Sequence, residues 1–176
     1  MCYRITVSFV DVLFRSYAKN VTICSKNEVL SLDSTVTRIV VEKGCCNDAE
    51  ISVWNLNRFL FLRELVVGDE SFMYVKEVKL IGLSELESVE IGMNSFTRSK
   101  NGYGQDPNRH FYLKNCPKLK SLKMGRYSFS DYTVIEIENV DALEAIEMGN
   151  ANNLEAESYN FHSASLELRS ILIHNE

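Results

Sequence analysis

The chain of 176 residues has the length of one ordinary domain, and its 45% hydrophobic and 24% charged residues are typical of a globular protein rather than a disordered one. A net charge of −5 argues against non-specific binding to nucleic acid, which requires a basic surface. Charged residues interrupt the apolar start of the chain at Arg4, Asp11 and Arg15, so it fits neither a secretory signal nor a membrane span. We therefore expect a cytoplasmic location and no membrane contact.

The five cysteines do not indicate a disulfide framework, because their number is odd and no Cys-x-x-Cys pair occurs. Free thiols are the simpler expectation. The alternative is a metal site built on the adjacent pair Cys45–Cys46 together with other ligands. No cofactor is expected.

Residues 1–50 are expected to form a divergent N-terminal cap or degenerate repeat, because they follow no clear apolar register. One incomplete register ends at Val36, Ile39 and Val41. The earlier stretch "YRITVSFVDVLFRS" alternates only in part, and its pattern leaves strand and helix open.

Residues 51–176 repeat one apolar register, with steps of 2, 3, 3, 3 and 2 between successive apolar positions. A step of two keeps both side chains on one face of a strand, whereas a step of three marks a bend. A helix would require steps of three and four over several turns. Each unit therefore predicts two short strands joined by a bend. The four full series are Trp54, Leu56, Phe59, Leu62, Leu65, Val67; Val78, Leu80, Leu83, Leu86, Val89, Ile91; Phe111, Leu113, Cys116, Leu119, Leu122, Met124; and Ile135, Ile137, Val140, Leu143, Ile146, Met148, with a truncated fifth at Leu166, Leu168 and Ile171.

The bends carry residues that suit turns, for instance Gly82, Asn115 and Asn139 just before an inward apolar residue. A second corner carries the motif Gly-x-x-Ser-Phe at 68–72, 92–96 and 125–129. Stacked units would place equivalent residues in columns with parallel ladders between them, as in a solenoid. This predicts one column of Leu65, Val89, Leu122 and Ile146, a second of Val67, Ile91, Met124 and Met148, and an aromatic column of Phe72, Phe96 and Phe129.

The segment "LESVEIGMNSF" resembles the leucine-rich repeat pattern LxxLxLxxNxL at every marked position. "LRELVVGDESF" and "LKSLKMGRYSF" match it except at the Asn position, which holds Glu70 and Tyr127. The runs "IG..SF" and "NCPKLKSLKMG" are also similar to BspA-like leucine-rich repeats. The resemblance covers about residues 54–172 and implies a mostly β fold (β-rich α/β at most), a right-handed solenoid with parallel strands and units of about 24 residues. It further implies non-catalytic protein binding through a concave sheet.

Insertions between units fall in one segment of the repeat. From Ile91 to Phe111 the spacing is 20 residues, where Val67 to Val78 takes 11. The segment 97–111 carries Arg98, Lys100, Tyr103 and Arg109, a composition typical of contact loops. These four residues are candidate partner contacts, and the alternative is a tolerated surface insertion without function.

The outward residues Glu90, Lys123 and Glu147 are expected on successive strands of one sheet. They are candidate partner contacts on the face that leucine-rich repeat proteins commonly use. The alternative is a solvated row of ion pairs that contributes little.

We do not expect an enzyme, because no P-loop, GxGxxG or HExxH motif occurs. His110 with Asp106 is a short-range acid–base pair without a nucleophile beside it. The expected partner is a protein, not nucleic acid. The alternative function is a structural or self-associating protein of the BspA-like kind, a homo-oligomer joined through exposed solenoid ends.

Overall fold

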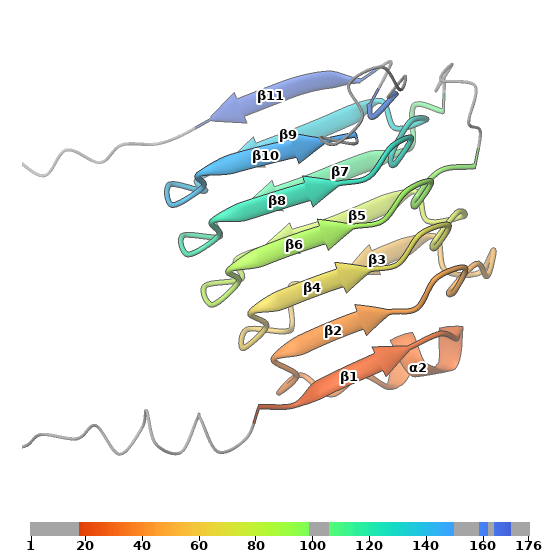
Figure 1. Ribbon diagram of the computed structural model, residues 1–176, viewed down its shortest axis with the longest axis vertical. Helices are drawn as coiled ribbons and strands as arrows, with labels where there is room; N and C mark the ends of the chain where they lie inside the picture. The colour runs from red at the N-terminus through yellow and green to blue at the C-terminus, as the bar shows by residue number, and fades with distance from the viewer. Residues whose placement is uncertain (1–17, 99–105, 150–158, 162–163, 170–176) are drawn as a thin grey trace, which may run out of the picture.

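A computed structural model describes residues 18–98, 106–149, 159–161 and 164–169 (Figure 1). These residues form short strands and one helix. The elements in chain order are β1 (Asn20–Ile23), α2 (Lys26–Ser31), β2 (Arg38–Val41), β3 (Val53–Asn55), β4 (Glu64–Val67), β5 (Glu77–Ile81), β6 (Ser88–Ile91), β7 (His110–Lys114), β8 (Ser121–Met124), β9 (Val134–Glu138), β10 (Ala145–Met148) and β11 (Ser165–Arg169).

The strands form two sheets in which all neighbouring strands are parallel. One sheet has the order β1-β2-β4-β6-β8-β10 and the other the order β11-β9-β7-β5-β3, so from β2 onward the chain alternates between them. The two sheets face each other with opposite strand directions (Figure 1). The predicted mostly β class with parallel strands is confirmed. We call a strand of the five-stranded sheet, the bend after it and the next strand of the six-stranded sheet a unit.

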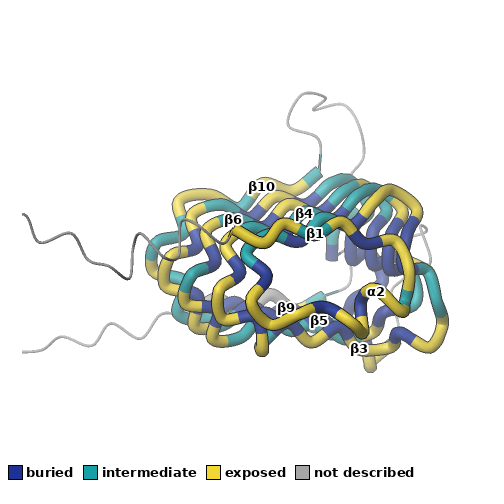
Figure 2. Tube along the Cα trace, turned by 90° about the horizontal axis from the view of Figure 1, so that it is seen from below, coloured by how far each residue is buried: buried dark blue, intermediate teal, exposed yellow. Residues whose placement is uncertain are grey.

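The side chains of the predicted apolar register fill the space between the sheets, where the buried residues gather (Figure 2). All six apolar positions of the units β3–β4, β5–β6 and β7–β8 are at most 3% exposed. The predicted columns are also confirmed, since Leu65 pairs with Val89, Val89 with Leu122 and Leu122 with Ile146. In β9–β10 the register loosens, and Met148 is 42% exposed, because β10 is the last strand of its sheet in the described residues.

A hydrogen-bonded turn closes each bend. The amide of Leu86 donates to the carbonyl of Leu83 at 3.2 Å, and the amide of Leu119 donates to that of Cys116 at 3.1 Å. In the units β5–β6, β7–β8 and β9–β10 the residue before the inward one has a positive φ, 73° at Gly82, 54° at Asn115 and 53° at Asn139, a conformation that Gly and Asn tolerate best. The turn chemistry predicted for the bends is therefore confirmed.

The phenylalanines of the Gly-x-x-Ser-Phe corners stack as predicted. The ring centroids of Phe72 and Phe96 are 5.2 Å apart, and those of Phe96 and Phe129 are 4.7 Å apart. The column is longer than the motif indicates. The ring centroid of Trp54 lies 4.2 Å from that of Phe72, and the ring centroid of Phe161 lies 5.0 Å from that of Phe129. Aromatic rings thus run through the units from β3 to the segment before β11.

The serine and glycine of the motif join neighbouring units rather than serving only their own turn. Ser95 Oγ donates to the carbonyl of Gly68 at 2.8 Å, and Ser128 Oγ donates to that of Gly92 at 2.6 Å. A Cβ on Gly92 would lie 2.4 Å from the backbone nitrogen of Asp69, closer than real contacts allow. Each serine therefore joins neighbouring corners, and the glycine lets these corners approach closely.

The N-terminal end replaces a strand of the five-stranded sheet by the helix α2. Ser25 is its N-cap: the amide of Glu28 donates to Ser25 Oγ at 3.4 Å, and the amide of Ser25 donates to Glu28 Oε2 at 2.8 Å. Cys24 and Cys45 form a disulfide across 21 residues, so the expectation of free thiols is wrong for this pair. It failed because the two cysteines meet only through the pairing of β1 with β2. No helix among the described residues is long and apolar enough to cross a membrane.

Candidate partner-binding surfaces

The outward side chains of β2, β4, β6, β8 and β10 in the six-stranded sheet form a regular face. We call this set the six-stranded face, and it consists of Arg38, Val40, Glu64, Val66, Ser88, Glu90, Ser121, Lys123, Ala145 and Glu147. Strand pairing places Glu90 beside Lys123 and Lys123 beside Glu147, so the predicted column exists. Because the backbone ladder fixes this register, the face presents its side chains at constant spacing.

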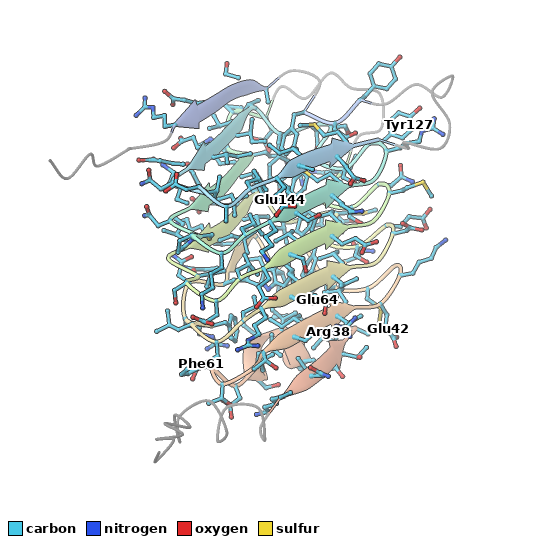
Figure 3. All side chains as sticks on the ribbon, turned by 60° about the vertical axis from the view of Figure 1, so that its left-hand side comes forward. Arg38, Glu42, Phe61, Glu64, Tyr127 and Glu144 are labelled. Carbon is cyan, nitrogen blue, oxygen red and sulfur yellow. A yellow bond between two sulfur atoms is a disulfide. The ribbon has the colours of Figure 1, made fainter. Side chains whose placement is uncertain are left out.

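Charges on the six-stranded face pair at its two ends. Arg38 Nε lies 2.6 Å from Glu64 Oε2 on the next strand (Figure 3). Lys123 Nζ lies 3.2 Å from Glu147 Oε1, and both of these side chains are about half exposed. Between them, Glu90 is exposed and makes no ion pair with any other described residue. Its register neighbours are Val66 on one side and Lys123 on the other, and Ser88 and Ser121 lie two positions earlier on β6 and β8.

The outer face of the five-stranded sheet is different, because its charges pair with one another near its centre. Lys114 Nζ lies 2.6 Å from Glu136 Oε2 and 3.3 Å from Glu138 Oε2. The hydrogen bond to Glu136 is the main cause that raises the pKa of Lys114. Partial burial raises the pKa of neighbouring Tyr112, whose ring lies 5.6 Å from Lys114 Nζ. A partner at this face would have to compete with contacts already made within the chain.

The insertion 97–111 is described only at its ends. Arg98 is exposed, and its guanidinium lies 5.9 Å from the ring of Tyr74. Lys100 and Tyr103 lie outside the described residues. The candidate role of these three residues stays a prediction.

Arg109 is buried, so the structure contradicts its assignment as an exposed contact. Its side chain is 3% exposed and pairs with Asp131. Its Nη2 donates to the carbonyls of Met73 at 2.7 Å and Val75 at 3.0 Å, and its guanidinium lies 5.1 Å from the ring of Tyr132. These contacts satisfy a charge that would be costly to bury alone.

The Arg109–Asp131 pair anchors the base of the insertion. Asp131 Oδ2 also accepts a hydrogen bond from the amide of Arg98 at 3.1 Å, so one carboxylate contacts residues on both sides of the segment 99–105. Tyr132, fully buried, donates from its hydroxyl to the carbonyl of Val75 at 2.7 Å. Sequence reasoning missed Asp131 and Tyr132. The only feature of the sequence that marks these two residues is their place shortly after the Gly-x-x-Ser-Phe motif at 125–129.

The pair of His110 and Asp106 does not form. The ring nitrogens of His110 contact the Tyr112 hydroxyl at 2.8 Å and the Pro107 carbonyl at 2.7 Å. Asp106 instead lies 3.4 Å from Lys76 Nζ. The arrangement therefore offers no carboxylate to orient the imidazole as a base.

A pocket of about 530 Å³ opens beside β3, the last strand of the five-stranded sheet at the N-terminal end. Its lining includes two exposed apolar side chains, Leu30 of α2 at 65% and Val53 of β3 at 47%. Arg58 borders it, donating to the carbonyl of Leu32 at 2.9 Å. The pocket exists because a short helix covers this end less fully than a strand would, which the apolar register does not indicate.

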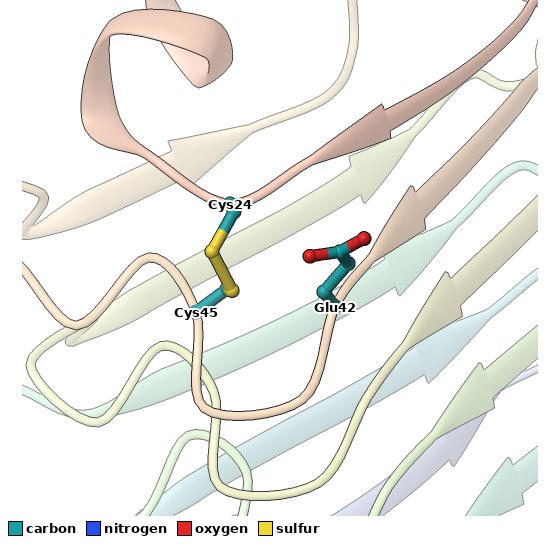
Figure 4. Close-up of side chains that lie close together, drawn as sticks. All are labelled: Cys24, Glu42 and Cys45. Atoms are coloured by element: carbon teal, nitrogen blue, oxygen red, sulfur yellow. A yellow bond between two sulfur atoms is a disulfide. The ribbon is translucent and has the colours of Figure 1, made fainter.

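One cluster of metal-ligating side chains lies at the N-terminal corner. The sulfur atoms of Cys24 and Cys45 and a carboxylate oxygen of Glu42 all lie within 4.8 Å of one another (Figure 4). Cys24 and Glu42 are exposed and Cys45 is buried. The metal alternative considered for Cys45–Cys46 thus involves only Cys45, since Cys46 is outside this group.

Comparison with protein-family models, with characterised proteins and with solved structures finds no match to this chain.

Proposed function

We propose that the chain is a right-handed solenoid of leucine-rich repeat type that binds another protein without catalysis. The paired columns and the alternation of the chain between two parallel sheets support the solenoid. The side-chain oxygen at the family's asparagine position does not bridge the units here, because Asn94 Oδ1 is buried without a hydrogen-bond partner among the described residues. The serine hydroxyls of the corners bridge them instead.

The six-stranded face, together with the edge at 97–111, is the proposed contact surface. The observation that carries this proposal is Glu90, an exposed carboxylate that makes no ion pair with another described residue, because Lys123 beside it pairs with Glu147. A partner cation can pair with Glu90 without breaking a contact inside the chain. Interfaces combine small and apolar side chains with a few well-placed charges.

The test is proximity labelling or pull-down with the wild type and two charge-reversal variants. Glu90→Lys changes the face, and Glu87→Lys makes the same change in the preceding bend, where the side chain is also exposed. We expect a discrete protein partner with the wild type and with Glu87→Lys, and at least tenfold less of it with Glu90→Lys, roughly the effect of one good charge pair. Equal recovery with all three chains would remove the six-stranded face as the contact.

Deletion of residues 100–108 tests the edge separately. We expect the folded protein to lose part of its partner recovery. Unchanged recovery would leave the insertion as a tolerated surface segment.

Self-association is the second candidate function. It rests on Met148, 42% exposed on β10, the last described strand of the six-stranded sheet. An apolar strand at a sheet edge favours pairing with another chain. Sedimentation across protein concentrations separates the two candidates, since only self-association predicts a mass that rises with concentration.

The cytoplasmic location stays a prediction, and the Cys24–Cys45 disulfide weighs against it. Disulfides are rare in the cytosol apart from redox-active ones. Alkylation of the thiols in intact cells, followed by a non-reducing gel, shows whether Cys24 and Cys45 are oxidised or reduced in the compartment where the protein resides.

A further inference from the structure

The strands β1 and β2 bring Cys24 and Glu42 together. Ile23 pairs with Val41 at the ends of these strands, so the next residue of each, Cys24 and Glu42, leaves the sheet side by side. The chain then turns, with the amide of Cys45 donating to the carbonyl of Glu42 at 3.3 Å, and Cys45 returns to the same corner. Three ligands from two neighbouring turns therefore meet, as Figure 4 shows.

Backbone contacts hold this corner independently of the disulfide. The amide of Glu42 donates to the carbonyl of Ile23 at 3.1 Å, and that of Cys46 donates to the carbonyl of Cys24 at 2.9 Å. The amide of Cys45 also donates to Ser71 Oγ at 3.2 Å. Reduction breaks only the sulfur–sulfur bond, so the two thiols and the carboxylate remain neighbours.

The reduced corner keeps its two thiols protonated unless a cation binds. Two thiolates beside a carboxylate would repel one another, since like charges at such distances oppose ionisation. A divalent cation removes that repulsion by displacing both thiol protons. Thiolate and carboxylate ligands together suit Zn²⁺ better than Mg²⁺ or Ca²⁺, which prefer oxygen alone.

The dimensions of the cluster fit tetrahedral zinc. With Zn–S bonds of about 2.3 Å, two sulfur ligands lie about 3.8 Å apart, a separation that side-chain rotation of Cys24 and Cys45 can reach. The carboxylate of Glu42 is already within 4.8 Å of both sulfur atoms. The fourth position faces solvent, because Cys24 and Glu42 are exposed.

We propose that Cys24, Cys45 and Glu42 form a redox-dependent Zn²⁺ site. In the oxidised protein the two sulfur atoms are joined and the site is closed. A dithiol reductant transfers two electrons to the disulfide, giving two protein thiols and the oxidised reductant. Zn²⁺ then binds both thiolates and the Glu42 carboxylate, with release of two protons. The disulfide in the oxidised state and the bound zinc ion in the reduced state both link the turn after β1 to the turn after β2.

The two free thiols among the described residues serve as internal controls. Cys46 and Cys116 are both buried, and burial raises the pKa of each to about 11. Neither belongs to the three-residue cluster. Their thiolates are therefore disfavoured, and the site does not depend on Cys116.

The experiment measures zinc binding by the full chain in both redox states. Protein is reduced with a phosphine, desalted without oxygen and titrated with Zn²⁺ against a chromophoric chelator, and Co²⁺ binding is followed by thiolate-to-metal absorption. We expect one tightly bound Zn²⁺ per reduced chain and at least about a hundredfold weaker binding by the oxidised chain. Equal binding by the two forms would overturn the proposal.

Variants identify the ligands. Cys24→Ser should abolish the site, and Glu42→Gln should weaken zinc binding at least about tenfold while keeping the disulfide. Glu70→Gln, which alters an exposed carboxylate at the next corner, and Cys116→Ser should bind as the wild type does. Retention of wild-type affinity by Glu42→Gln would refute the carboxylate ligand, and retention by a Cys24→Ser/Cys45→Ser chain would refute the site. If Cys24→Ser fails to fold, Glu42→Gln and the oxidised wild type still decide the question.

Discussion

The middle units and the N-terminal end are built from the same turns and parallel strands but are held together differently. Between β3 and β9 the units share buried apolar columns and a stack of aromatic rings. At the N-terminal end a six-residue helix replaces a strand, and a disulfide and a capping box complete the contacts. The apolar columns continue into this end, since Ile39 pairs with Leu65 and Val41 with Val67 and both are buried. The comparison therefore indicates that the end adds specific polar and covalent contacts to the side-chain columns that stabilise the middle.

The aromatic stack should give the largest effect. We expect Phe96→Ala to lower the free energy of unfolding by about 3–5 kcal/mol, because Phe96 is fully buried between two other rings. Phe61→Ala, at a side chain that is 39% exposed, should cost clearly less. Urea unfolding measures both. A small loss for Phe96→Ala would mean that the middle does not depend on the stack.

A matched pair of methionines compares a middle strand with the C-terminal edge. Met124 and Met148 pair in the register, but Met124 is 2% exposed and Met148 is 42% exposed. Met124→Ala should cost about 2–5 kcal/mol and Met148→Ala less than about 1 kcal/mol. Equal losses in urea unfolding would indicate that β10 is covered in solution, as self-association predicts.

The disulfide should stabilise the N-terminal end in oxidising solution only. A closed loop of 21 residues corresponds to about 3 kcal/mol in the chain-entropy account. We expect Cys24→Ser to lose roughly that amount without reductant and to equal the wild type when both are reduced and zinc-free. A difference that survives reduction would assign the loss to the serine rather than to the bond.

The corner serines should give a smaller effect. Ser95→Ala removes the donor to the Gly68 carbonyl, a buried contact between units, and should cost about 1–3 kcal/mol. Ser84→Ala, at an exposed position in the bend, is the control and should lie within about 0.5 kcal/mol of the wild type. Similar values for both variants would show that the hydroxyls do not join the units.

The sequence predicts the middle units well because their apolar residues recur with the same spacing in every unit. Steps of two and three fix which side chains turn inward, so the pairing of Leu65 with Val89 could be inferred without coordinates. Arg109 could not be placed, because its burial depends on Asp131 and Tyr132, more than 20 residues away in a polar stretch. The Cys24–Cys45 bond depends on the register of β1 against β2, where no repeated apolar series exists.

The smallest expected effect is a response of the N-terminal end to acid. Glu28 accepts hydrogen bonds from the amides of Cys24 and Ser25, and the bond from Cys24 is the main cause that lowers its pKa below the ordinary 4.5. A carboxyl with a depressed pKa contributes stability above its unfolded value, and this stability is lost as the pH falls through the folded value. The cap of α2 should therefore loosen only as the pH falls below the ordinary 4.5 of a glutamate, before the middle units change. Amide chemical shifts of Cys24 and Ser25 measured from about pH 6 to pH 2 would report this loosening.

The control is Glu28→Gln, which cannot ionise and should abolish this step while leaving the shifts of β6 unchanged. A step that persists in Glu28→Gln would show that the Glu28 carboxylate is not its cause.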